Sequence, residues 1–368
     1  MFYHYLPSLT DFHIIFNLFT FITFRAAGAL VTSLLIAFIL GPSTIRMLKK
    51  FGIGEVVRSD GPGGHLAKQG TPTMGGILIV LPATLSTLLW AELNNWYIVI
   101  ALTTFLAMST IGFMDDYLKV VRFQTDGLIA RYKMLGQWVF GIGLGVFLII
   151  YPISPLEANR TMLPFFSELS LVINPVLYVI FVSFVISGSS NAVNLTDGLD
   201  GLATGLVAVA SATFGILAYL VGRVDSSSYL GLFYLPGAGE LGILALAITG
   251  SCLGFLWYNS HPAEIFMGDT GALGLGGVIG AIAILLKAEF FLAIVGGVFI
   301  AEVLSVVFQV GFFRYTRAKS GTGKKIFRMA PLHHHFEELG WTESKVVVRF
   351  WVLGIMCAMV ALSALKIR

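Results

Sequence analysis

The chain has 368 residues, of which 57% are hydrophobic and only 12% are charged, with a net charge of +3. An ordinary soluble domain has about twice that share of charged residues, and the mean hydropathy of this chain is +0.86. The composition therefore excludes a soluble globular protein and indicates a polytopic membrane protein. The small net charge is the sum of unevenly charged connections, so it identifies no partner, and we expect no nucleic acid among its ligands.

Long apolar segments follow one another along the chain, after a lead-in over residues 1–24 that lacks the basic start of a signal peptide. A helix needs about 20 mostly apolar residues to cross a bilayer. The expected spans cover 26–46, 75–93, 97–114, 134–152, 174–189, 202–222, 240–258, 270–287, 289–313 and 346–366. We therefore predict an all-α bundle of about ten transmembrane helices that forms a single integral membrane domain over residues 1–368.

Most lysine and arginine residues lie in alternate connections between these spans, at 46–73, 115–133 and 314–349. Basic connections remain in the cytoplasm, so these three are expected to be cytoplasmic and both termini periplasmic. The connections 190–201 and 259–269 then lie on the same cytoplasmic face. All the polar stretches described below therefore share one face of the membrane and can form one active site.

Asp115 and Asp116 lie where the third span reaches this face. Adjacent carboxylates on a helix point to different sides, so one can contact a cation while the other takes a proton. The alternative is two solvated acids at a helix end, a position that the helix macrodipole disfavours. We favour the functional interpretation, with Lys119 and Lys133 supplying positive charge, although juxtamembrane lysines commonly only fix topology or contact anionic lipid.

Asn191, Asn194, Asp197 and Asp200 recur at every third residue after the fifth span. On a helix this spacing aligns side chains along one stripe. Carboxylates and amides together suit a sugar, a nucleobase edge or a hydrated divalent ion. A turn with Asn and Asp caps is the alternative, but so many polar groups between two apolar spans favour a binding site.

Asp269 precedes a glycine-rich span, where a helix-capping role alone would explain it. Beside other acids it can also bind magnesium, which takes carboxylates, phosphate oxygens and water. The segment Lys68–Gly76 offers an ammonium group and backbone donors to a phosphate, although its spacing does not match the Walker motif. Glu302 and Gln309 share one face of the ninth span, and the acid is expected to face the bundle interior, for pairing or for ligand.

His333, His334 and His335 lie in the last basic connection. Three successive histidines do not easily face one metal and no cysteine is near, so a zinc site is not expected. We expect an anion pocket instead, with one histidine oriented by Glu337 or Glu338 and another in contact with phosphate. The alternative is a solvated loop or a patch on the membrane surface.

Together these stretches resemble the bacterial phospho-N-acetylmuramoyl-pentapeptide transferases. The resemblance rests on the acid pair, Asn191–Gly201, Phe266–Asp269, Met329–His335 and Gly70–Gly76, and it covers nearly the whole chain. The triple histidine is its most specific part. The acid motifs are shared with the wider superfamily of polyprenyl-phosphate sugar-1-phosphate transferases, so they do not separate its members.

The resemblance implies transfer of phospho-N-acetylmuramoyl-pentapeptide from a UDP-linked donor to undecaprenyl phosphate, with release of UMP. It also implies dependence on Mg²⁺, location in the bacterial inner membrane and a homodimer. The implied catalytic positions are Asp115, Asp116, Asp269 and His333, and Asp269 is the implied metal ligand. Our mechanistic hypothesis adds Asp116 as a second candidate metal ligand. The implied substrate-binding positions are Lys68, Thr73, Lys119, Lys133, Asn191, Asn194, Asp197, Leu199, Asp200, Asn259, Phe266, Gln309, His334 and His335.

Two other functions fit parts of the pattern. A polyprenyl-phosphate N-acetylglucosamine-1-phosphate transferase would keep the acid motifs, but it should differ in the histidine connection. A secondary transporter binds its coupling ions near the bilayer midplane on broken helices, whereas the acids here lie at one face. Two mechanisms also remain open, namely direct attack by the lipid phosphate and a two-step route through a phosphorylated aspartate.

Overall fold

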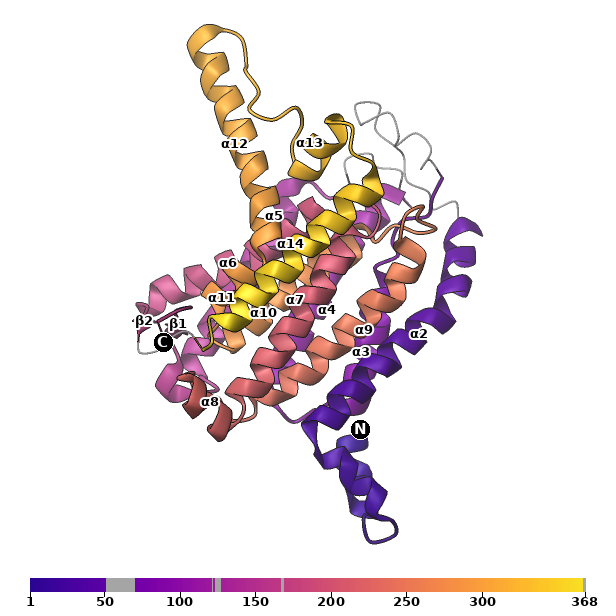
Figure 1. Cartoon of the computed structure of the whole chain (residues 1–368), viewed down its shortest axis with the longest axis vertical. Coiled ribbons are helices and arrows are strands. Elements are labelled where there is room, and N and C mark those ends of the chain that lie inside the picture. Colours follow the sequence, from indigo (N-terminus) through magenta and orange to yellow (C-terminus); the bar gives the residue numbers. More distant parts are fainter. Residues whose placement is uncertain (51–69, 121, 123–126, 167–168, 367–368) are drawn as a thin grey trace.

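The computed structural model describes residues 1–50, 70–120, 122, 127–166 and 169–366. Within these ranges nine helices are long and apolar enough to cross a membrane, and one further apolar helix is shorter. This confirms the predicted all-α membrane bundle (Figure 1). The long helices are α2 (Ile22–Lys50), α4 (Trp96–Val120), α5 (Ala130–Ile150), α6 (Pro175–Thr196), α7 (Leu202–Val221), α9 (Leu241–Asn259), α10 (Gly268–Leu285), α12 (Gly297–Ser320) and α14 (Glu343–Ser363), and the shorter one is α3 (Ile77–Trp90).

Short elements join these helices. A two-stranded antiparallel sheet pairs β1 (Arg160–Met162) with β2 (Ser170–Val172), and Thr161 lies opposite Leu171. The remaining short helices are α1 (Phe2–Tyr5), α8 (Val224–Leu230), α11 (Glu289–Val295) and α13 (Leu332–Glu338), with 3₁₀ turns at Pro7–Leu9, Ile14–Thr20, Pro155–Glu157 and Ala238–Glu240. The sheet and α8 lie toward one end of the bundle, and α13 lies at the other (Figure 1).

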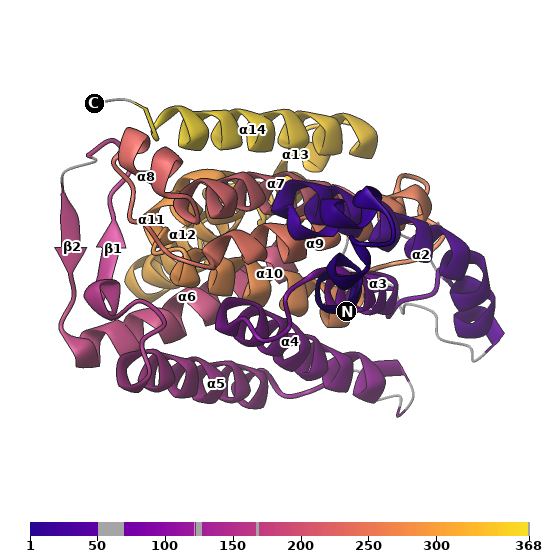
Figure 2. The ribbon, with the colours of Figure 1, turned by 90° about the horizontal axis from the view of Figure 1, so that it is seen from below.

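The central helix is α10, which packs against α4, α6 and α7 and is almost wholly buried. Seen from below, it lies between α4 and α5 on one side and α7 and α14 on the other (Figure 2). Glycine allows this close packing at the start of α10. A Cβ added at Gly112 of α4 would lie 2.1 Å from the carbonyl oxygen of Asp269, and one at Gly76 would lie 2.1 Å from the backbone nitrogen of Gly271.

The helix boundaries differ from the predictions in three places. The expected span 75–93 is the shorter helix α3, and the expected short span 174–189 is a full helix, α6, of 22 residues. The expected span 289–313 is divided at Gly296 into α11 and α12. Two consecutive glycines interrupt the helix there, as is common at sharp bends, and α12 then projects beyond the bundle (Figure 1).

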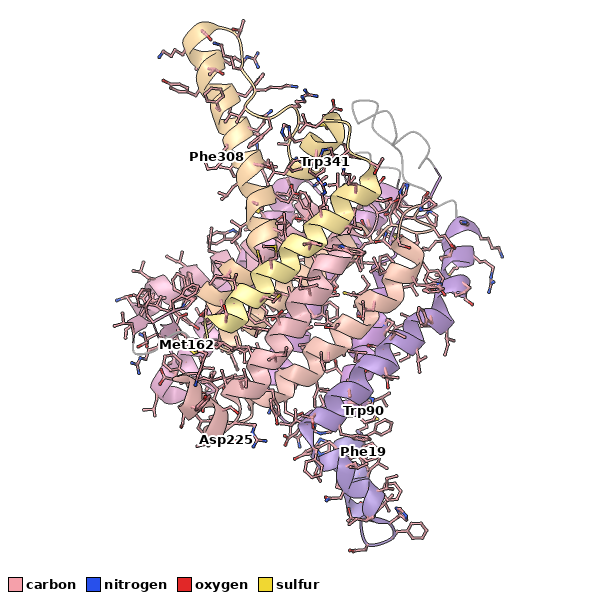
Figure 3. The ribbon with its side chains drawn as sticks, viewed as in Figure 1. Phe19, Trp90, Met162, Asp225, Phe308 and Trp341 are labelled. Carbon is pink, nitrogen blue, oxygen red and sulfur yellow. The ribbon has the colours of Figure 1, made fainter. Side chains whose placement is uncertain are left out.

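A buried ion pair joins three helices near the N-terminal end of the bundle. Arg25 of α2 donates to both carboxylate oxygens of Glu240, at 2.8 and 2.5 Å. The same carboxylate accepts the backbone N–H of Glu92, just after α3, at 2.9 Å. The N-terminal segment packs beside it, with the rings of Phe19 and Trp90 stacked 5.6 Å apart (Figure 3).

Candidate active site

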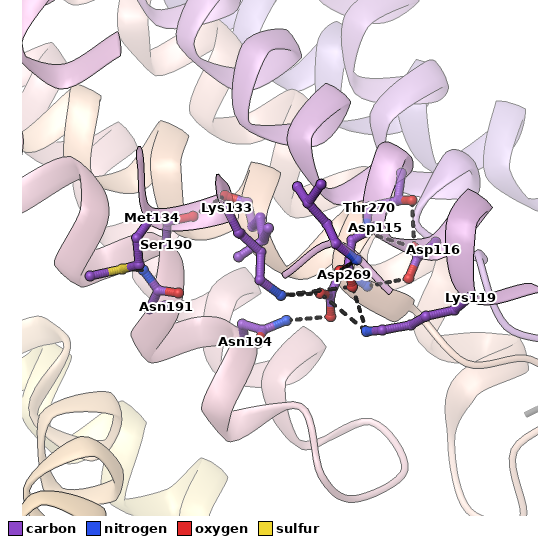
Figure 4. A network of polar contacts seen from close by, with 12 residues as sticks. Asp115, Asp116, Lys119, Lys133, Met134, Ser190, Asn191, Asn194, Asp269 and Thr270 are labelled. Atoms are coloured by element: carbon purple, nitrogen blue, oxygen red, sulfur yellow. Dashed lines mark hydrogen bonds and ion pairs between the residues drawn. The ribbon is translucent and has the colours of Figure 1, made fainter. Parts of the chain in front are cut away.

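Three carboxylates meet where the cytoplasmic ends of α4 and α10 are expected to lie. Asp115 and Asp116 come from α4 and Asp269 from the first turn of α10, and their nearest oxygen atoms lie within 4.8 Å of one another (Figure 4). Asp115 is 1% exposed and Asp116 is 4% exposed. These residues are not the solvated acids of a free helix end, so the alternative considered for the pair is wrong.

Asp116 fixes the start of α10. Its Oδ1 accepts the backbone N–H of Asp269 at 3.1 Å, and its Oδ2 accepts the backbone N–H of Thr270 at 2.9 Å and the Thr270 hydroxyl at 2.6 Å. The first N–H groups of a helix have no partner within the helix and require an outside acceptor. Asp116 therefore caps α10 from a neighbouring helix, and Asp269 itself is free of the capping role that its position suggested.

Two lysines lie against the acids. The Lys133 ammonium of α5 lies 2.6 Å from Asp269 Oδ2 and 3.7 Å from Asp115 Oδ2. The Lys119 ammonium pairs with Asp115, one helical turn away, and lies 3.5 Å from Asp269 Oδ2. Asp115 Oδ1 also accepts the backbone N–H of Leu128 at 2.8 Å. Acids and lysines therefore form one charged cluster in which each lysine bridges two carboxylates.

The polar residues of α6 divide between two sets of contacts. The Asn194 amide donates to Asp269 Oδ1 at 2.7 Å and belongs to the acid cluster. The Asn191 amide donates to the side-chain oxygen of Gln137, at 2.6 Å, and to the carbonyl of Ser187, at 2.7 Å. Gln137 also donates to Ser190 at 3.3 Å, so Asn191 joins a polar contact between α5 and α6. Asn191 lies to one side of the acid cluster (Figure 4).

The expected single stripe of four polar side chains is wrong beyond Asn194, because α6 ends at Thr196. Asp197 is the C-terminal capping residue, with its N–H bonded to the carbonyl of Val193 at 3.1 Å. Asp200 points to a different set of partners. Its Oδ2 lies 3.0 Å from His261 Nδ1 and accepts the N–H of Ala263 at 3.1 Å.

Glu343, at the start of α14, completes this second cluster. Its Oε1 accepts the backbone N–H of Asp200 at 2.8 Å, and its Oε2 lies 3.4 Å from His261 Nδ1. The turn 197–201 also contains Leu199, whose side chain is buried. The turn that carries Asp197, Leu199 and Asp200 is thus fixed on one side by residues far away in the sequence.

Asn259 ties the same turn to the connection 260–267. Its side-chain oxygen accepts the N–H of Gly201 at 3.1 Å and the hydroxyl of Thr204 at 3.2 Å, and its amide donates to the carbonyl of Ile265 at 2.9 Å. Asn259 is 2% exposed. Its polar atoms are used within the protein, so its contribution to a binding site would be to hold the surrounding backbone.

The glycine-rich segment before α3 runs beside Phe266. The Phe266 N–H donates to the carbonyl of Pro72, and its carbonyl accepts the N–H of Gly75, both at 2.8 Å. Thr73 lies near Gly268, where an added Cβ would be 3.1 Å from the Thr73 hydroxyl and 2.8 Å from Asp116 Oδ2. This places Thr73 at the edge of the acid cluster. Lys68 lies outside the described residues.

Glu302 and Gln309 anchor the connection that carries the histidines, which confirms that they share one face of α12. Gln309 accepts the N–H groups of Ile326 and Phe327, each at 3.0 Å, and donates to the carbonyl of Phe327. Glu302 is fully buried and accepts the N–H of Leu332 at 2.6 Å. The prediction that this acid faces inward for pairing is confirmed.

The three histidines have three different partners. His333 Nδ1 lies 3.2 Å from Glu302 Oε1, and His334 Nδ1 lies 2.8 Å from Glu337 Oε2. His335 Nδ1 accepts the backbone N–H of Arg328 at 3.2 Å. The expectation that Glu337 orients one histidine is confirmed. His333 is 1% exposed, and this burial lowers the pKa of its imidazole below the usual value despite the bond to Glu302.

An apolar groove of about 390 Å³ opens between α6, α10, α11 and α12. It is lined along α6 from Phe181 to Val193, and Phe299 and Leu304 line it from α12. Val193 directly precedes Asn194, whose amide contacts Asp269. The groove thus runs along α6 toward the acid cluster.

Sequence reasoning did not identify Gln137, Thr270, His261 and Glu343 as parts of these clusters. A lone glutamine inside the span 134–152 was a usable signal, because polar groups in a span normally face a partner. His261 and Glu343 gave no signal, since their contacts with Asp200 join segments that are far apart in the chain.

The fold and the site define an integral membrane enzyme with a buried charged centre beside an apolar groove. Residues 97–287 match the family described as glycosyl transferase family 4, and residues 68–80 match phospho-N-acetylmuramoyl-pentapeptide-transferase signature 1. The chain is 51% identical to the phospho-N-acetylmuramoyl-pentapeptide-transferase of Gemmatimonas aurantiaca and 50% identical to that of Citrifermentans bemidjiense, each over the full length of both chains. It is 49% identical to that of Rickettsia prowazekii, over 99% of this chain and 98% of the relative.

The chain therefore belongs to the phospho-N-acetylmuramoyl-pentapeptide-transferase family. It is a multi-pass transferase of the bacterial inner membrane.

Proposed function

We propose that the chain transfers phospho-N-acetylmuramoyl-pentapeptide from its UDP-linked donor to undecaprenyl phosphate, giving the first lipid-linked peptidoglycan precursor and UMP. The observation that carries the proposal is a junction along α6, where the wall of the apolar groove extends to Val193 and the next residue, Asn194, contacts Asp269 of the acid and lysine cluster. A reaction between a water-soluble nucleotide and a membrane lipid requires such a junction.

The groove suits the lipid acceptor. Its α6 wall extends from Phe181 to Val193, which is about 18 Å of helix at 1.5 Å per residue. An apolar polyprenyl chain lying along this wall would gain the free energy of apolar burial. Its phosphate would then lie beside Asn194, within reach of the charged cluster.

Lys119 and Lys133 suit the phosphates of both substrates. Each ammonium now contacts two carboxylates, and ammonium groups form strong charge-assisted hydrogen bonds with phosphate oxygens. Phosphoryl transfer depends mainly on alignment and charge neutralisation. We infer that the lysines bind non-bridging oxygens of the reacting phosphates while the acids retain part of their present contacts.

The donor set also fits Mg²⁺, which binds carboxylate oxygens together with phosphate oxygens and water. The nearest oxygens of Asp115, Asp116 and Asp269 lie within 4.8 Å of one another, and two ammonium groups now pair with Asp115 and Asp269. We propose that Asp269 and Asp116 hold the ion. When bound, it would supply neutralisation of the negative charge that develops on the diphosphate of the donor.

For the reaction itself we favour direct attack. An oxygen of the lipid phosphate would bond to the phosphorus attached to the sugar, and the bond from that phosphorus to UMP would break. Asp115, beside Lys119 and Lys133, is the group proposed to accept the proton of the attacking phosphate. An Asp115→Asn variant that retained near-full turnover would remove this role, and trapping a sugar-phosphate aspartyl ester would favour the two-step route.

The remaining binding positions are proposed for the nucleotide and its sugar. They comprise Lys68, Thr73, Asn191, Asp197, Leu199, Asp200, Asn259, Phe266, Gln309, His334 and His335. Asp197, Leu199 and Asp200 lie in the turn 197–201, and Asn259 bonds to this turn through Gly201. We also propose a homodimer, on the strength of the resemblance alone. The mass of the protein in detergent, corrected for bound detergent, would test this assembly.

The test of function measures UMP release by the purified protein supplied with polyprenyl phosphate, Mg²⁺ and one UDP-sugar at a time. We expect release only with the muramoyl-pentapeptide donor. Release with UDP-N-acetylglucosamine instead would support the alternative transferase, and no release with any donor would contradict transferase activity. The matched controls are Asp269→Asn, expected to be inactive, and Asp225→Asn, at an exposed acid after α7 that pairs with Arg223.

A further inference from the structure

Glu302 is a fully buried acid whose carboxylate, among the described residues, makes its hydrogen bonds to the histidine helix α13. Its Oε2 accepts the backbone N–H of Leu332 at 2.6 Å, and its Oε1 accepts that of His333 at 3.3 Å. The same Oε1 lies 3.2 Å from Nδ1 of the His333 ring. One carboxylate on α12 thus holds both the backbone and the side chain of His333.

These contacts decide where the His333 imidazole carries its proton. A carboxylate only accepts hydrogen bonds, and here both of its oxygens already accept a backbone N–H. The ring nitrogen facing it must therefore be the donor, so Nδ1 carries the proton. In the neutral imidazole the lone pair is then on Nε2.

Nε2 is buried and has no hydrogen-bond partner within the described part of the chain. It points at the turn 197–201, where a Cβ added at Gly198 would lie 2.3 Å from it. Gly198 lies between Asp197 and Leu199. A buried polar atom without a partner is rare in native proteins and calls for an explanation, and here it faces the turn that carries the proposed substrate contacts.

We propose that Glu302 is a positioning residue, which fixes His333 in the Nδ1–H tautomer so that Nε2 accepts a hydrogen bond from an N–H or O–H group of the bound nucleotide-sugar donor at the Gly198 turn. The proposal rests on the proposed function, because it needs a donor substrate bound there. Because Gly198 has no side chain, the His333 ring lies directly against the turn, and a shift of the turn would open Nε2 to a bound donor.

Three variants separate this role from a structural one. Glu302→Gln offers an amide N–H to Nδ1, which would turn the ring into the opposite tautomer, with the proton on Nε2. His333→Asn keeps a donor for Glu302 but has no group at the Nε2 position. His333→Gln places an amide oxygen near that position and can accept in place of Nε2.

The experiment measures kcat and KM for the UDP-linked donor by UMP release, together with thermal unfolding. Loss of one hydrogen bond to the substrate should raise the donor KM about tenfold in Glu302→Gln and in His333→Asn. His333→Gln should recover most of the donor affinity that His333→Asn loses, because its amide oxygen can accept in place of Nε2. The double variant Glu302→Gln/His333→Asn should be no worse than His333→Asn alone, because Glu302 acts through Nε2.

The pH dependence gives a second readout. The charged and titratable groups facing His333 are Glu302 on α12 and His334 and Glu337 on α13, and burial outweighs them in lowering its pKa. Protonation converts Nε2 from an acceptor into a donor, so the donor KM should rise as the pH falls through this pKa, on the acid side of about 6.5. The ratio of native KM to His333→Gln KM should show this rise, because glutamine does not titrate.

Several results would overturn the proposal. A native KM in His333→Asn would show that Nε2 does not contact the donor, and a further tenfold loss on adding Glu302→Gln to that variant would show a purely structural role. If Glu302→Gln fails to fold, the pair His333→Asn and His333→Gln still decides the question. A native enzyme that releases no UMP would instead refute the proposed function.

Discussion

The contact between Gly112 and α10 allows a quantitative test of how the acid cluster is built. In Gly112→Ala the added Cβ would lie 2.1 Å from the Asp269 carbonyl oxygen, whereas ordinary contacts begin near 3.4 Å. Helix α4 must then move from the first turn of α10 by roughly 1 Å, a displacement that can cost about 100-fold in rate at a reacting centre. Overpacking of this kind lowers the free energy of unfolding by about 1–3 kcal/mol. The better helix propensity of alanine offsets about 1 kcal/mol of this loss.

Gly143 supplies the matched control. It lies in α5, where an added Cβ meets nothing within 4 Å, so Gly143→Ala should gain up to about 1 kcal/mol of helix propensity and keep native activity. The assay is UMP release alongside thermal unfolding in the same detergent. We expect Gly112→Ala to lose about two orders of magnitude in kcat with a lower unfolding temperature. Native kcat in Gly112→Ala would refute the view that close packing of α4 on α10 sets the geometry of the acids.

Three further predictions follow from the described contacts. Asp269→Asn removes the charge that Lys133 and Asn194 contact and should lower UMP release at least 100-fold without loss of folded protein, whereas a smaller effect would place the metal elsewhere. Glu240→Gln leaves the buried Arg25 without a charged partner and should destabilise the protein by about 3 kcal/mol; its activity at low temperature should stay native, since this pair lies far from the acids. Removal of divalent ions with a chelator should abolish UMP release and added Mg²⁺ should restore it, and activity that survives chelation would contradict the metal proposal.

The order and approximate positions of the membrane helices could be predicted because apolar length is a local property. Every long helix corresponds to an expected apolar span, and the basic connections fall between them. The division of the ninth span at Gly296 was not predicted, because glycines are also common inside membrane helices. Whether such a position bends depends on packing against neighbours, which a single sequence does not contain.

The sequence predicted which residues form the candidate site better than it predicted how they are arranged. The grouping of Asp115, Asp116 and Asp269 was expected from their shared face, and the structure brings them together. The capping of α10 by Asp116 could not be predicted, since it depends on how two helices pack. The separation of Asp200 from Asn194 was missed because the spacing of three was extended past the end of α6.

The close burial of α10 also bears on how the enzyme could move during turnover. The backbone of this helix packs directly against neighbouring backbone, and Asp116 caps its first turn. The position of Asp269 is therefore fixed. The turn 197–201 and α13 are held instead by side-chain hydrogen bonds from Glu343, Asn259 and Glu302. Such bonds can rearrange without moving a packed helix, so we expect adjustment to differently sized reactants in these elements. An inhibitor that binds beside Asp269 would therefore contact a rigid part of the site, whereas its contacts with the turn 197–201 and α13 would be made with elements that can adjust.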